Sequence, residues 1–141
     1  MKLYRYCSRE EYQKFQREAQ LENLAQHRRD CQGFCFFAFK DLHEAQHTLH
    51  QLTGIVTPEI LMILETGKSL NKSRGRYAKP LPKNATFDDY FNPFNVEWRE
   101  EYCTTSYSKE DFKLLEAYEV DLNLFYEDEA KAFTKLEDKT I

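Results

Sequence analysis

Residues 96–105 constrain the fold most, because they are typical of a β-strand yet carry two adjacent carboxylates in the middle. Successive side chains of a strand point to opposite faces. Four positions therefore share one face and four the other: Val96, Trp98, Glu100 and Tyr102 against Glu97, Arg99, Glu101 and Cys103. One of Glu100 and Glu101 must then lie beside large apolar groups. A carboxylate in that position needs a bonded partner or a chemical task.

Apolar patterns along the chain predict five strands. They lie at residues 2–7, 33–39, 59–65, 96–105 and 112–118. The last two are separated by a short turn, so we expect them to pair antiparallel.

Two capping sequences predict helices. Ser8 and Asp41 are each followed three residues later by a glutamate, Glu11 or Glu44, which is the spacing of a capping box. Together with the strands, these helices predict an α+β domain. We expect a mixed or antiparallel sheet of about five to six strands with two to three flanking helices.

The length of 141 residues matches one domain, which buries enough surface to fold without disulfides or metals. Aromatic residues make up 15% of the chain and charged residues 31%, which favours a globular protein over a disordered one. We therefore expect a single domain over 1–141. Prolines and a lack of periodicity predict a long loop at 68–95, and residues 127–141 are compatible with a terminal helix or a frayed tail.

The sequence shows no export signal, so we expect a cytoplasmic protein with reduced cysteines. No apolar run approaches the roughly 20 residues of a membrane helix, so we expect no membrane partner. The four cysteines form no CxxC pair, and we expect reduced structural thiols, with a zinc site at Cys31 and Cys35 as the alternative.

The charge of the chain is divided unevenly. Residues 66–85 carry six bases and no acid, whereas residues 86–141 carry fifteen acids and six bases. The basic stretch has two interpretations: it binds phosphate, or it is a solvated loop that balances the acidic part. The net charge of -4 disfavours nucleic acid as a partner, because phosphate binding depends on positive charge.

The order of the elements resembles that of the ADP-ribosyltransferase-like fold, roughly over residues 2–118. The matching features are Arg5 in the first strand, the aromatic strand entered at Gly33, a loop containing Tyr77, and Glu101 late in the chain. In that family, a first-strand arginine, a middle-strand motif and a late glutamate surround an NAD cleft. The hydroxyl signature of the middle strand is replaced here by FFA at 36–38.

The resemblance implies roles for particular residues. Glu101, with Glu100 beside it, would be catalytic, because a carboxylate stabilises the positive charge that develops on the ribose when the nicotinamide bond breaks. Arg5 and Tyr6 would bind the cofactor, the arginine through paired bonds to phosphate. Three aromatic residues would contact the nicotinamide: Phe36, Phe37 and Tyr77.

Each assignment has a structural alternative. Arg5 is also consistent with an ion pair to a carboxylate, and Glu100 and Glu101 with salt bridges to Arg5 or Arg99. The phenylalanines are also consistent with a core. Three histidines, His43, His47 and His50, share one face of the second helix, as a plain helix face or as a metal site, and we expect no metal.

Two functions therefore remain open. The first is an NAD-binding ADP-ribosyltransferase-like protein that acts on a host or defence component. A phage origin fits this function, since the resemblance extends to small proteins of phages and their hosts. The second is a non-catalytic inhibitor of the anti-defence type that binds a protein partner on the same fold. The order of Arg5, Phe36, Phe37 and Glu101 motivates the first, and the missing hydroxyl and the uneven charge motivate the second as the alternative.

Overall fold

The computed structural model describes ten segments of the chain: 1–18, 34–49, 58–78, 84, 86, 88, 96–104, 107–108, 110–125 and 127–136. These residues form an α+β fold with a seven-stranded antiparallel sheet and three helices, so the expected α+β class is confirmed, but the sheet has more strands than the five to six expected. The strands are β1 (Lys2–Cys7), β2 (Phe34–Phe37), β3 (Ile60–Glu65), β4 (Asn71–Ala78), β5 (Val96–Thr104), β6 (Lys113–Val120) and β7 (Phe133–Lys135). The helices are α1 (Arg9–Glu18), α2 (Leu42–Thr48) and α3 (Leu122–Phe125).

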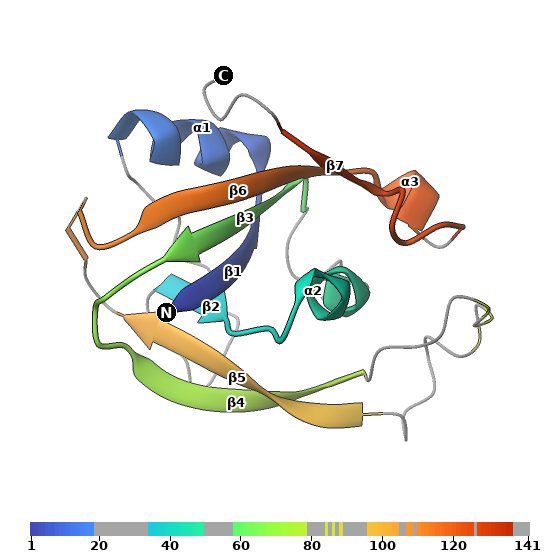
Figure 1. The fold of residues 1–141 in the computed structure, drawn as a ribbon, viewed down its shortest axis with the longest axis horizontal. Helices are drawn as coiled ribbons and strands as arrows, with labels where there is room; N and C mark the ends of the chain where they lie inside the picture. The colour runs from blue at the N-terminus through green and yellow to red at the C-terminus, as the bar shows by residue number, and fades with distance from the viewer. Residues whose placement is uncertain are drawn as a thin grey trace.

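The strands follow the order β4-β5-β2-β1-β3-β6-β7, and every neighbouring pair is antiparallel. Figure 1 shows that the sheet curves around α2, with β6 on one side of the helix and β4 on the other. We call the side that holds α2 the concave face and the side that holds α1 the convex face.

The N-terminal caps of α1 and α2 form as predicted. The Ser8 hydroxyl accepts a hydrogen bond from the Glu11 amide at 3.1 Å, and the Asp41 carboxylate accepts one from the Glu44 amide at 2.9 Å. Each cap satisfies an amide that the helix itself leaves without a backbone acceptor. Helix formation therefore follows directly from the local sequence at these two sites.

Each face of the sheet has its own apolar core. On the convex face, Tyr12 and Phe15 of α1 pack with strand residues such as Phe36 and Met62. On the concave face, α2 and α3 pack against the other side of the same strands, through a set that includes Tyr4, Tyr6, Ala45, Leu49, Leu61 and Phe125. The two cores explain why β1 and β3 are buried on both sides.

The predicted loop and the predicted terminal helix are both wrong in part. Residues 71–78 of the expected 68–95 loop form β4, which pairs with β5 over eight positions. Residues 133–135 of the segment 127–141, expected as a terminal helix or a frayed tail, form β7, which pairs with β6. In both cases pairing with a neighbouring strand decides the structure, and local sequence patterns carry no record of that neighbour.

The expected pairing of the strands at 96–105 and 112–118 is also wrong. β5 pairs with β2 and β4, whereas β6 pairs with β3 and β7. The connection between them carries Tyr107 and Phe112, and Phe112 stacks on Phe36 of β2 with ring centroids 4.8 Å apart. The connection contains a tight turn, in which the Asp111 amide donates to the Ser108 carbonyl at 3.1 Å, but it packs into the convex core and does not join β5 and β6 as a hairpin.

The cysteines differ from expectation as well. Cys35 is disulfide-bonded, whereas Cys7 and Cys103 are buried thiols. The expectation of four reduced thiols is therefore wrong for Cys35, and Cys31 lies outside the described residues. Among the helices of the described segments, none has the length and apolar character needed to cross a membrane.

Candidate functional site

Arg5 lies inside the convex core, where its guanidinium is held on three sides. Its Nε and Nη2 atoms donate to the two carboxylate oxygens of Glu11 at 2.9 and 2.8 Å, and Nη1 donates to the Cys35 carbonyl at 2.7 Å. The guanidinium also lies over the Phe36 ring, 5.5 Å from its centroid. Arg5 is 2% exposed and Glu11 1% exposed, so this pair is closed to solvent.

The register of the sheet puts Arg5 and Glu101 on opposite faces. Tyr4 pairs with Phe37, and Phe37 pairs with Glu101, so these three residues share the concave face. Arg5 is the neighbour of Tyr4 along β1 and therefore points to the convex face. The structure does not bring the predicted cofactor arginine and the predicted catalytic glutamate to one pocket.

The two adjacent carboxylates of β5 lie in different environments. Glu101 is 3% exposed, so one of the two is indeed buried. Glu100 is 48% exposed, although the sequence pattern had grouped it with the large apolar residues of the strand. The pattern misleads because Trp98, on the same face as Glu100, is itself 58% exposed.

Glu100 is bound at the surface by two neighbours. Lys72 Nζ lies 2.7 Å from one of its oxygens, and the Tyr102 hydroxyl donates to the other at 2.8 Å. The hydrogen bond from Lys72 first, and that from Tyr102 second, lower the pKa of Glu100, because both favour the charged form. Glu100 is therefore a stable surface anion at neutral pH.

The predicted cofactor aromatics are spread over both faces. Phe36 lies in the convex core, whereas Phe37 lies on the concave side and stacks on Phe39 with centroids 4.9 Å apart. Tyr77 pairs in register with Glu97 near the end of β4. Phe36 and Phe37 therefore cannot both contact one nicotinamide ring.

Tyr6 attaches β1 to α2 on the concave face. Its hydroxyl donates to the Ala45 carbonyl at 2.5 Å. Burial, and secondly the negative charge of Glu129, raise the pKa of Tyr6 well above its ordinary value. The tyrosine is therefore a neutral donor that holds the helix.

Sequence reasoning missed the importance of two glutamates. Glu11 was assigned to the helix cap, and its carboxylate instead binds Arg5. Glu129 faces two histidines of α2, with its oxygens 3.2 Å from Nδ1 of the fully buried His47 and 3.8 Å from Nδ1 of His43. The spacing of the two histidines, four residues apart, was the available signal for a shared partner.

The two histidines of α2 share the Glu129 carboxylate. No group of three or more potential ligands suited to a metal ion is found among the residues that the structure describes, and His50 lies outside them. The contacts to Glu129 instead connect α2 with the segment that follows α3.

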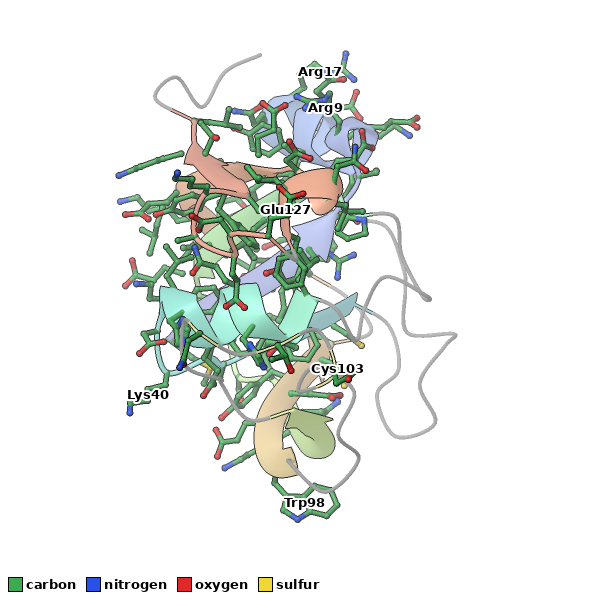
Figure 2. The ribbon with its side chains drawn as sticks, turned by 90° about the vertical axis from the view of Figure 1, so that its right-hand side faces the viewer. Arg9, Arg17, Lys40, Trp98, Cys103 and Glu127 are labelled. Carbon is green, nitrogen blue, oxygen red and sulfur yellow. The ribbon has the colours of Figure 1, made fainter. Side chains whose placement is uncertain are left out.

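The outer parts of β4 and β5 form a feature that the sequence did not indicate. The Glu100 carbonyl accepts a hydrogen bond from Ala38, and beyond this point the described part of β5 pairs with β4 alone. We call residues 75–78 and 96–99 the β4–β5 arm. Figure 2 shows Trp98 projecting from this arm at the opposite end of the molecule from Arg9 and Arg17.

Comparison of the chain with protein-family models, with curated proteins and with solved structures finds no match. The arguments for its function therefore depend on its own geometry.

Proposed function

We propose that this chain is a non-catalytic protein-binding module that contacts its partner through the β4–β5 arm. The observation that carries the proposal is the closed Arg5–Glu11 pair on the face opposite Glu101. A cofactor clamp must reach its ligand, and this guanidinium already makes bonds to a carboxylate and a carbonyl inside the core.

An ADP-ribosyltransferase-like architecture remains part of the proposal. The strands that carry Arg5, Phe36 and Glu101 are β1, β2 and β5, which are consecutive neighbours in the sheet. This arrangement supports the expected layout of the fold. The opposite faces of Arg5 and Glu101 argue against the expected chemistry.

The arm supplies the binding surface. Trp98 and Met1 are the large apolar residues that the described part of the structure leaves exposed. Tryptophan is enriched among the residues that dominate protein–protein binding energy, because one rigid side chain buries a large apolar area. The idea that the partner is a host or defence component depends on the family resemblance alone.

A second candidate, an NAD-binding transferase, is favoured by the burial of Glu101 on the concave face, where it pairs with Phe37 of β2. In that case NAD would bind the chain, and Glu101→Gln would abolish the modification of a target.

The proposal is tested by capturing partners with immobilised wild-type chain, Trp98→Ala and Glu101→Gln, and then titrating the purified partner. We expect the wild type and Glu101→Gln to bind alike and Trp98→Ala to bind at least about tenfold more weakly. Trp98 is the single tryptophan of the chain, so its fluorescence emission reports directly on burial of the arm. A partner that binds Trp98→Ala normally would contradict the proposal.

A further inference from the structure

The two edges of the sheet differ in length and charge. β4 ends the sheet on one side with eight residues, and β7 ends it on the other with three. An edge strand carries backbone donors and acceptors that another strand can bind. In the described part of the chain β4 has one neighbouring strand, β5, so its other side is the longer of the two edges of this sheet.

Positive residues occupy three successive alternate positions of β4. Lys72, Arg74 and Arg76 pair in register with Tyr102, Glu100 and Trp98 of β5. The Lys72 side chain is 58% exposed, and its Nζ atom forms an ion pair with the Glu100 carboxylate. These three bases belong to the stretch 66–85, which contains six bases and no acid.

We propose that the edge of β4 binds an extended acidic segment of the protein partner as an added strand. This inference depends on the proposed protein-binding function and specifies the chemistry of the partner. Backbone hydrogen bonds supply affinity in strand addition, and alternate side chains supply specificity. Alternate residues of a strand repeat every ~6.6–6.8 Å, so a partner with a carboxylate at every second position matches the bases of β4.

The charge of the edge distinguishes this occupant from others. A second copy of the chain would bring the same bases opposite one another, and like charges on paired strands repel. A nucleic acid is disfavoured by Glu100 in the same row and by the net charge of -4. An acidic peptide segment is attracted by the edge, and its carboxylates would lie beside the bases of β4, with Trp98 and Tyr102 one strand further into the sheet.

The test uses a synthetic peptide of about nine residues that alternates threonine with glutamate, and a matched peptide with lysine in place of glutamate. We expect the acidic peptide to bind the full chain at least about tenfold more tightly than the basic one. Hydrogen exchange distinguishes strand addition from simple charge attraction, because an added strand protects alternate amides of residues 71–78.

Two double variants with the same change in net charge locate the site. Lys72→Glu/Arg76→Glu reverses charge on β4, and Lys131→Glu/Lys135→Glu reverses it at and near the opposite edge. We expect about tenfold weaker peptide binding for the first and wild-type binding for the second, with folding of both checked by circular dichroism.

Three results would overturn the inference: equal binding of both peptides, binding without amide protection in β4, or binding of a single-stranded oligonucleotide in place of the acidic peptide. The protein-binding function would survive each of them if a captured partner still required Trp98. The proposed protein-binding function would fail separately, if a captured partner bound Trp98→Ala as tightly as the wild type.

Discussion

Two ion pairs between a base and a glutamate show how differently the sheet centre and its edge are built. Arg5 and Glu11 are joined by two hydrogen bonds at 2.9 and 2.8 Å and are closed to solvent. Lys72 and Glu100 are joined at 2.7 Å, but both remain about half exposed. Distance alone does not separate the two pairs, whereas burial does.

The difference determines what each pair can do. A buried pair holds its partners strongly, because breaking it leaves an uncompensated charge away from water. An exposed pair contributes little to stability, because water solvates either partner when the pair opens. The centre therefore uses its charges for structure, whereas the paired charges at the edge remain in contact with water.

The largest expected effect follows from removing one member of the buried pair. Arg5→Ala should lower the free energy of unfolding by about 3–5 kcal/mol, because Glu11 is left charged in the core. Lys72→Ala is the matched control and should cost less than about 1 kcal/mol. Urea denaturation measures both, and equal losses would remove the distinction between centre and edge.

Replacing both members of the buried pair should be less harmful than replacing one. Arg5→Met/Glu11→Leu removes both charges, so we expect a smaller loss than in Arg5→Ala, with a coupling energy of at least about 2 kcal/mol in a double-mutant cycle. Additive losses would show that Arg5 and Glu11 do not depend on each other.

Two tyrosine–glutamate contacts extend the comparison to alkaline pH. Tyr118 donates to Glu116 at 2.9 Å, as Tyr102 donates to Glu100 at 2.8 Å. Burial first, and then the hydrogen bond to Glu116, raise the pKa of Tyr118 from 10.0 to about 12. Because the pKa of Tyr118 is higher in the folded than in the unfolded chain, this tyrosine contributes to stability fully below pH 10. The contribution is lost as the pH rises toward 12.

Stability should therefore decline between about pH 10 and 12, and Tyr118→Phe should reduce the decline. Denaturant titrations across this range measure the effect. If the free energy of unfolding fell with pH equally steeply in Tyr118→Phe and in the wild type, Tyr118 would have the same pKa in the folded and the unfolded chain.

The smallest expected effect lies beside the arm. Lys72→Met should raise the pKa of Glu100 toward its ordinary value, and Tyr102→Phe should raise it less, because the Lys72 hydrogen bond is the larger cause of the shift. Carboxyl NMR titration resolves the order. A larger change in Tyr102→Phe would reverse this ranking of the two contacts.

The sequence predicts the interior of the fold well because local patterns determine it. Ser8 and Asp41 mark the two helix starts, and the run Ile60–Glu65 forms the central strand β3 that its apolar residues indicate. Strand positions are also right for β1, β2, β5 and β6 within a few residues. These elements contain their own signals.

The edges of the sheet were not predictable in the same way. β4 consists of alternating polar and basic residues, NKSRGRYA, and it is a strand because β5 lies beside it. The faces of Arg5 and Glu101 depend on register across β1, β2 and β5, which a single sequence does not specify. Predicting which residues share the candidate site therefore requires the pairing and register of the strands as well as their positions in the sequence.

The most direct test of the account is a calorimetric titration of NAD into the folded wild-type chain. Because Arg5 is bonded to Glu11 inside the core, we predict no saturable heat at millimolar NAD. Saturable binding that Glu101→Gln abolishes would contradict the account and favour the transferase.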